Sequence, residues 1–228
     1  MIVGLSDSIK RLLIVGAGAL GQELKWWMAR GLQRSSPGLN KQVWFLDDRP
    51  GDKPWVLGGT ELLNRTNDSD LVLVAVGDPE SRRRIVDQFY AGDAGNCKFG
   101  SFVHKTCTPN KPPSDAPWPQ GALMMPYSSR SVGAKLGDFC VVNTYSGIGH
   151  GAVLGPFCTL ASGVVICGEA RLADGVSVGT GAMVMPGVTV GPWAKVAPGA
   201  VVMRDVPAGC TVAGNPARIV VTAEGTKA

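Results

Sequence analysis

A six-residue period runs without interruption from Leu136 to Pro207. Its first position is Leu, Ile or Val in all twelve hexads, and its fifth position is Cys, Ser, Ala or Val. This period fits neither a helix, which repeats every 3.6 residues, nor a plain strand, which alternates every second residue. It is typical of a parallel β-helix, in which a short strand and a corner recur and successive coils stack. We therefore expect the first position to point inward and the fifth to pack at the corner.

The residues before the repeat follow a different pattern. Apolar runs that predict strands alternate with segments that predict helices. The strands are expected at 11–15, 43–47 and 70–76, and the helices at 22–32 and 78–89. This alternation indicates a parallel α/β sheet. We expect an α/β domain over residues 1–105, a Pro-rich linker over 106–121 and the β-helix with its C-terminal tail over 122–228.

Composition excludes several classes of protein. The net charge is only +4, and the one tight basic run, Arg82 to Arg84, follows a helix start at Asp78, so we interpret it as a solvated helix face rather than a nucleic-acid site. No stretch of about 18 apolar residues predicts a membrane span, and the first ten residues lack the order of a signal peptide, so neither is expected. The six cysteines form no C-x-x-C pair, which favours a cytoplasmic protein with reduced cysteines. The two histidines are too few for a multi-histidine metal site, so no metal is expected.

A glycine-rich loop lies between the first strand and the first helix. Gly16, Gly18 and Gly21 form a G-x-G-x-x-G motif, in which the backbone approaches a phosphate and the helix N-terminus favours its negative charge. Asp47 and Asp48, at the end of the next strand, are placed to accept hydrogen bonds from a ribose. Taken alone, this pattern favours a dinucleotide. The domain is only half of a full dinucleotide fold, however, so a mononucleotide-linked ligand fits equally well.

A second candidate site follows from the repeat. Three hexads make one coil, so residues eighteen apart stack, at a spacing of about 4.8 Å between neighbouring strands. His150 is the third residue of its hexad and is expected at a corner, exposed. Gly168 lies one coil on from His150, and Glu169 lies one coil on from Gly151. A neutral imidazole beside a free backbone N–H is a base next to an oxyanion donor, so we predict a catalytic role for His150.

These motifs together resemble a known family. A glycine loop, FLDD at 45–48, Asn143 seven residues ahead of His150, and GNPAR at 214–218 are similar to those of bacterial sugar acetyltransferases. That family includes the UDP-4-amino-sugar N-acetyltransferases and the sialic acid O-acetyltransferase relatives. The resemblance extends from Leu12 to about Ile219. It implies a Rossmann-like nucleotide-sugar-binding domain followed by a left-handed β-helix of hexapeptide repeats. It also implies a homotrimer, with acetyl-CoA bound along the groove between adjacent β-helices.

The resemblance assigns roles to individual residues. It implies that His150 is the general base, that Asn143 is a polar residue near it, and that the N–H of Gly168 stabilises the thioester oxyanion. The residues implied to contact acetyl-CoA are Thr159, Gly168, Thr180 and Pro198. The residues implied to hold the nucleotide-activated sugar are Gly16, Gly18, Ala19, Leu20, Asp47, Asp48 and Gly77.

The sequence departs from the family at several of these positions. Relatives commonly carry an acid immediately after the histidine, where this chain has Gly151. A histidine common in the glycine loop is Leu20 here, and Thr159 replaces a further histidine of some relatives. Glu169 stacks on Gly151, so we hypothesise that it supplies the missing acid. A weakly supported base favours an amine acceptor, which loses its proton more readily than a hydroxyl.

The ranking of functions follows from these observations. Acetyl transfer to a nucleotide-linked amino sugar comes first, and O-acetylation of a sugar hydroxyl of the sialic-acid type comes second. A non-catalytic trimeric scaffold is the alternative outside enzymology. A dehydrogenase comes last, because a β-helix is an unusual provider of catalytic residues around a nicotinamide.

Overall fold

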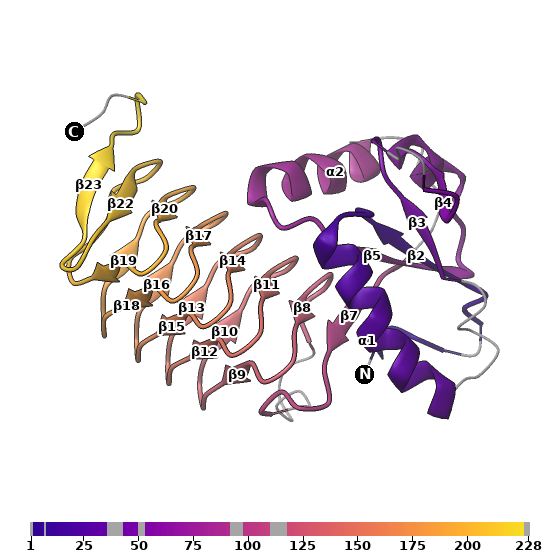
Figure 1. The fold of residues 1–228 in the computed structure, drawn as a ribbon, viewed down its shortest axis with the longest axis horizontal. Helices are drawn as coiled ribbons and strands as arrows, with labels where there is room; N and C mark the ends of the chain where they lie inside the picture. Colours follow the sequence, from indigo (N-terminus) through magenta and orange to yellow (C-terminus); the bar gives the residue numbers. More distant parts are fainter. Residues whose placement is uncertain are drawn as a thin grey trace. The chain divides into compact units, whose positions relative to one another are not determined.

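The computed structural model describes residues 2–6, 8–35, 43–49, 53–91, 98–109 and 118–225 of the 228-residue chain. The chain forms two compact units, Met1–Phe102 and Val103–Ala228 (Figure 1). Half of the expected linker, residues 110–117, lies outside the described residues.

The first unit is built on a five-stranded parallel sheet with the order β4-β3-β2-β5-β6. Helix α1 follows β2 along the chain and α2 follows β5, while the 3-10 helix η2 follows β4. The bounds are β2 Arg11–Val15, α1 Ala19–Ser35, β3 Val43–Leu46, β4 Val56–Gly58, η2 Thr60–Arg65, β5 Asp70–Val74, α2 Pro79–Ala91 and β6 Lys98–Phe99. The sequence predicted β2, β3, β5 and both helices. It missed β4, η2 and β6, whose short runs carry little periodicity. A further strand, β1 (Ile2–Val3), pairs antiparallel with β7 (Ser101–Val103).

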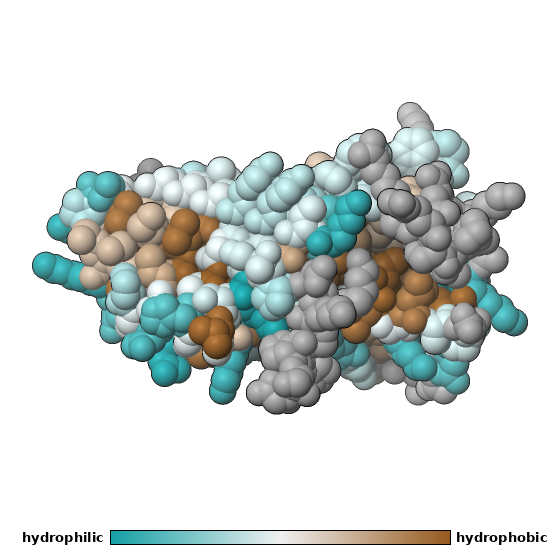
Figure 2. Space-filling model, turned by 90° about the horizontal axis from the view of Figure 1, so that it is seen from below, coloured by the Kyte–Doolittle hydropathy of each residue, from teal (hydrophilic) through white to brown (hydrophobic). Residues whose placement is uncertain are grey.

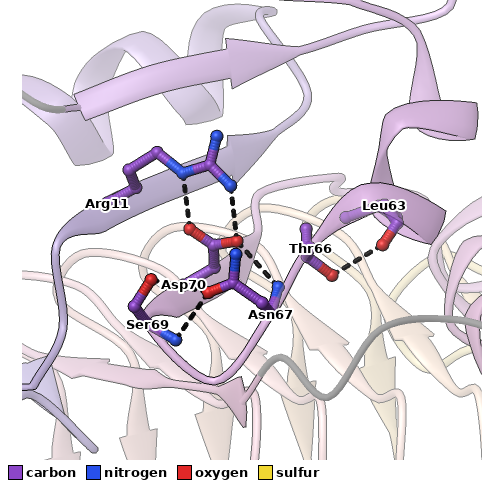
Figure 3. A network of polar contacts seen from close by, with 6 residues as sticks. All are labelled: Arg11, Leu63, Thr66, Asn67, Ser69 and Asp70. Atoms are coloured by element: carbon purple, nitrogen blue, oxygen red, sulfur yellow. Dashed lines mark hydrogen bonds and ion pairs between the residues drawn. The ribbon is translucent and has the colours of Figure 1, made fainter.

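A polar network ties together the beginnings of the two central strands (Figure 3). Asp70 of β5 is fully buried, and its two carboxylate oxygens accept hydrogen bonds from Nε and Nη2 of Arg11 at 2.6 and 2.7 Å. The backbone N–H of Asn67 also donates to Asp70, at 2.9 Å. The hydrogen bond to Asp70 raises the pKa of the Arg11 guanidinium above its usual range. A buried carboxylate is tolerated when it is paired and hydrogen-bonded in this way, so the network fixes the register of β2 against β5.

The expectation that the basic run is a solvated face is wrong for Arg82. Its side chain is completely buried, and Nη1 donates to the carbonyl oxygens of Val76 and Gly77, at 2.5 and 3.1 Å. Arg83 behaves as expected, pairing on the surface with Asp87. The helical period places Arg82 on the inner face of α2, and the carbonyls that follow β5 compensate for the burial of its charge.

The second unit is a parallel β-helix with an eighteen-residue coil. Three sheets of two-residue strands form its sides, and successive strands pair in parallel with Val141 opposite Thr159, Gly147 opposite Val165 and Val153 opposite Arg171. The prediction of three hexads per coil is confirmed. The strands are β8 Leu123–Met124, β9 Ser129–Arg130, β10 Lys135–Leu136, β11 Val141–Val142, β12 Gly147–Ile148, β13 Val153–Leu154, β14 Thr159–Leu160, β15 Val165–Ile166, β16 Arg171–Leu172, β17 Ser177–Val178, β18 Met183–Val184, β19 Thr189–Val190, β20 Lys195–Val196 and β21 Val201–Val202. An antiparallel hairpin of β22 (Thr211–Ala213) and β23 (Arg218–Val221) follows them.

The burial pattern of the β-helix follows the hexad. Every first position from Val142 to Val202 is buried, as is every fifth position from Cys140 to Val206, whereas the first position of the opening hexad, Leu136, is half-buried. The fourth position turns the corner with a positive φ and is often glycine. Six other residues adopt this conformation, with φ between 55° and 61°. They are Tyr127, Phe139, Tyr145, Phe157, Glu169 and Trp193.

Neither a membrane-spanning helix nor a cluster of metal ligands is found among the described residues. No helix among them is long and apolar enough to cross a membrane. No group of three or more His, Cys, Asp or Glu side chains within the described part of the chain is arranged to hold a metal ion.

Candidate functional site

The first candidate site lies at the carboxyl edge of the parallel sheet. The glycine loop follows β2, Asp47 follows β3 and Gly77 comes shortly after β5, and these three strands are neighbours in the sheet. Ligands of parallel α/β sheets bind at this edge. The structure therefore brings together all the residues that the sequence assigned to a nucleotide.

Two glycines of the loop are required by packing. Gly16 has φ of 101°, and a Cβ there would lie 2.7 Å from the carbonyl oxygen of Ala75. A Cβ on Gly21 would collide with the carbonyl oxygen of Gly16. Gly18 has open space around it, and with Ala19 it is exposed at the beginning of α1, while Leu20 is half-buried. The first turn of a helix has backbone N–H groups without partners inside the helix, which suits an anion.

The two aspartates have structural partners in the loops of this site. Asp47 Oδ2 accepts from the N–H of Ala17 at 2.7 Å, and its Oδ1 accepts from the N–H of Arg49 at 2.9 Å. Asp48 Oδ1 accepts from both the N–H and the hydroxyl of Thr60, at 2.7 and 2.8 Å. The sequence predicted that both aspartates bind a ribose. The geometry adds that Asp47 holds the glycine loop in place.

The second candidate site lies on a corner of the β-helix that we call the histidine corner. It contains Val132, His150, Gly168, Pro186 and Arg204, which are eighteen residues apart. His150 is exposed, as the sequence predicted, because the third hexad position points away from the core. Val132, one coil before it, exposes 83% of its surface.

Gly168 makes room for the imidazole. A Cβ on Gly168 would lie 2.6 Å from Cε1 of His150 and closer still to Nε2. The N–H of Gly168 donates to no acceptor in the described part of the chain. The ring of a base and an available backbone donor therefore meet at one point on the surface.

Glu169 stacks on Gly151 of the preceding coil, as the sequence predicted. Its N–H donates to the carbonyl oxygen of His150 at 2.8 Å, and a Cβ on Gly151 would lie 3.4 Å from its Cγ. The side chain is exposed and the backbone has φ of 61°. A non-glycine residue in this conformation carries strain, which is often found at functional sites.

The remaining predicted residues lie elsewhere on the same unit. Thr180 and Pro198 belong to the preceding corner, which we call the threonine corner and which contains Thr144, Ser162, Thr180 and Pro198. Asn143 lies at this corner too, and its Nδ2 donates to the carbonyl oxygen of Leu160 at 3.0 Å. Thr159 is in β14, and 9% of its surface is exposed. Within one chain, β12 separates Asn143 from His150.

Two exposed tyrosines on the threonine corner were not among the residues predicted from the sequence. Tyr127 and Tyr145 occupy the fourth hexad position, and their rings stack at 5.1 Å with an angle of 4° between the planes. The signal was present in the sequence, since both are aromatic where the later coils of this corner have glycine.

Comparison with solved structures places this architecture among acetyltransferases. The acetyltransferase domain of PglB from Neisseria gonorrhoeae, solved in complex with acetyl coenzyme A, is 30% identical with a TM-score of 0.79, over 92% of this chain and 99% of that one. WeeI from Acinetobacter baumannii is 25% identical with a TM-score of 0.73, over 92% and 99%. PerB from Caulobacter crescentus, in complex with CoA and GDP-perosamine, is 24% identical with a TM-score of 0.76, over 92% and 97%, and shows the fold alone. No protein-family model and no curated protein sequence matches the chain.

Proposed function

Because the chain belongs to the acetyl-CoA-dependent acetyltransferases related to the PglB acetyltransferase domain, we propose that it acetylates the amino group of a nucleotide-linked amino sugar. The observation that carries this proposal is the exposed imidazole of His150 beside the available N–H of Gly168.

The chemistry at this point is direct transfer. The amine nitrogen attacks the thioester carbonyl carbon of acetyl-CoA while His150 accepts a proton from the amine. The N–H of Gly168 stabilises the oxyanion of the tetrahedral intermediate. When the intermediate collapses, the carbon–sulfur bond breaks and the imidazolium returns the proton to the leaving thiolate. The products are an N-acetylated sugar and CoA.

The first unit is proposed to hold the nucleotide as a Rossmann-like domain. Its parallel sheet, the glycine loop with Gly18, Ala19 and Leu20 at the start of α1, and Gly77 after β5 support this role. The hydrogen bond from Ala17 to Asp47 keeps the loop in the conformation that exposes its N–H groups.

The active form is proposed to be a homotrimer of left-handed β-helices. His150 and the residues of the threonine corner belong to different corners of one chain, so a second copy is needed to complete the site. The sheet between these corners has an apolar outer face, with Val165, Met183 and Val201 in successive coils. Figure 2 shows apolar side chains gathered over this part of the β-helix. An apolar face flanked by two halves of a site supports association with another copy.

Acetyl-CoA is proposed to lie between the histidine corner of one copy and the threonine corner of the next. Thr180 and Pro198 lie one and two coils beyond Ser162 on the threonine corner, and the N–H of Gly199 donates to Thr180 at 2.8 Å. Thr159 and Gly168 complete the predicted contacts. Asn143 of the threonine corner would then approach the histidine of a neighbouring copy.

Release of free thiol from acetyl-CoA tests the proposal directly. UDP-, GDP- and dTDP-linked amino sugars, with hydroxyl counterparts of the same sugars, serve as acceptors. We expect release with an amino sugar and a decrease of about 10²- to 10⁴-fold in kcat for His150→Ala. Release with the hydroxyl sugars alone would favour O-acetylation. No release with any acceptor would favour a non-catalytic scaffold.

A further inference from the structure

The exposed tyrosine pair on the threonine corner has no evident role in folding. Tyr127 and Tyr145 expose 54% and 68% of their surface, although they stack on one another. Each also adopts a positive φ, 59° and 60°, a conformation that disfavours side chains. The next three coils have glycine at the same corner position. The pair therefore combines unfavourable backbone conformation with incomplete burial.

A second aromatic pair in the same β-helix shows what a structural stack looks like. Phe139 and Phe157, on the third corner, stack at 5.2 Å with an angle of 8°, and expose only 4% and 7%. The next coil of that corner has Gly175, and the ring of Trp193, one coil further on, fills the space over it. The aromatic column of the third corner is thus closed by a ring.

On the threonine corner, no aromatic ring of the described residues covers the stack of Tyr127 and Tyr145 in this way. The spacing of the tyrosine rings matches the rise of about 4.8 Å between coils, so the second face of Tyr145 turns toward the next coil. The residue there is Gly163, and a Cβ on it would meet nothing nearer than 4.0 Å. A Cβ on Gly181 or on Gly199, in the coils beyond it, would meet nothing within 4 Å. These three glycines therefore leave the threonine corner open beyond the ring of Tyr145.

The tyrosine pair and the catalytic histidine lie at neighbouring levels along the axis of the β-helix. Tyr145 lies in the corner before β12 and His150 in the corner after it, within one coil. Tyr127 and Val132 bear the same relation one coil earlier. A three-fold axis parallel to the coil axis keeps every residue at its own height. It therefore brings the tyrosine pair of one copy level with Val132 and His150 of the next.

We propose that Tyr127 and Tyr145 form the platform on which the sugar ring of the acceptor stacks, in the site whose histidine comes from a neighbouring copy. This inference rests on the proposed function. Thr180 and Pro198 lie in later coils of the corner, on the side assigned to the coenzyme, so the tyrosines lie on the acceptor side. An aromatic face packs against the C–H groups of a sugar, and the phenol can hydrogen-bond to its hydroxyls. Val132 adds an exposed apolar contact opposite.

Steady-state kinetics of Tyr145→Gly and Tyr127→Gly test this platform. Glycine suits a positive φ, so both variants should fold and melt at or above the temperature of the wild type. We expect KM for the amino-sugar acceptor to rise by about two- to twelve-fold, a range set by aromatic contact energies, with KM for acetyl-CoA unchanged. Tyr145→Phe, which keeps the ring, should retain most of the acceptor affinity.

Mixed trimers test which copy supplies the platform. His150→Ala and the double variant Tyr127→Gly/Tyr145→Gly are unfolded together and refolded at equal amounts, then assayed at low acceptor concentration. If the site is shared between copies, some interfaces of the mixed trimers regain both an intact histidine and an intact tyrosine pair. The mixture should then be more active than the sum of the two proteins refolded separately. An active wild type whose Tyr145→Gly variant keeps its acceptor KM, or mixed trimers without recovered activity, would overturn this inference alone. An inactive wild type would overturn the proposed function and this inference with it.

Discussion

The imidazole of His150 rests on the backbone of Gly168, in the space that a side chain on Gly168 would occupy. The two residues are eighteen positions apart and stack because one coil of the β-helix takes three hexads. The position of the ring therefore depends on the absence of a single methyl group in the neighbouring coil.

Gly168→Ala is expected to displace the imidazole without unfolding the protein. The new Cβ would meet the end of a surface side chain, which can swing away, so the melting temperature should change by only a few degrees. The base would then be misplaced relative to the oxyanion donor, and kcat should fall about 10²-fold. Thiol release from acetyl-CoA measures the effect.

A double-mutant cycle shows whether this effect passes through the histidine. If Gly168→Ala acts by moving the ring, adding it to His150→Ala should lower kcat no further. Additive losses would instead indicate that the substitution damages the oxyanion donor or the coenzyme site.

Glu169→Gln is expected to lower kcat by one to two orders of magnitude, on the order of 1.4–2.7 kcal/mol, if the carboxylate orients the imidazole from the neighbouring coil. Glu169→Gly removes the same charge at a positive φ and serves as the matched variant. Unchanged kcat in both would leave Glu169 as a solvated corner residue.

Gly181→Trp is expected to obstruct the proposed path of acetyl-CoA along the threonine corner. Trp193 shows that a tryptophan with φ of 58° can lie over the glycine one coil earlier, and the space around Gly181 is open. The new ring should cover Gly163 and raise KM for acetyl-CoA about tenfold or more. Gly181→Ala adds the backbone strain without the ring and should bind the coenzyme nearly normally. Equal KM values in both variants would contradict a coenzyme path along this corner.

The second histidine predicts a dependence of stability on pH. Burial lowers the pKa of His104, and its Nδ1 is within 3.3 Å of the backbone N–H of Thr106, which needs a neutral ring as acceptor. Between the lowered pKa and about 6.5, the unfolded chain binds more protons than the folded one. His104 therefore does not reduce the free energy of unfolding above about pH 6.5. As the pH falls from about 6.5 toward the lowered pKa, the free energy of unfolding decreases.

Urea denaturation between pH 8 and pH 5 measures this dependence. His104→Asn keeps a side-chain acceptor for Thr106 but does not titrate, so its free energy of unfolding should fall less over the acidic range. Parallel curves for the two proteins would rule out His104 as the source.

The sequence alone determined the β-helix, because its hexad records which side chains face the core at every coil. The register that stacks Gly168 on His150 and Glu169 on Gly151 follows from that period. The strands β2, β3 and β5 were equally predictable, since each is a continuous apolar run buried in a parallel sheet.

Residues with weak local signals take roles that depend on packing between distant parts of the chain. Arg82 looked like part of a solvated run, and its burial depends on carbonyl groups that follow another element. Tyr127 and Tyr145 have the same hexad position as Phe139 and Phe157, yet one pair is exposed and the other is covered. Because the hexad position is the same in both pairs, the difference arises from the other side chains around them. A local period specifies where a side chain points, whereas its burial depends on which other side chains reach the same space.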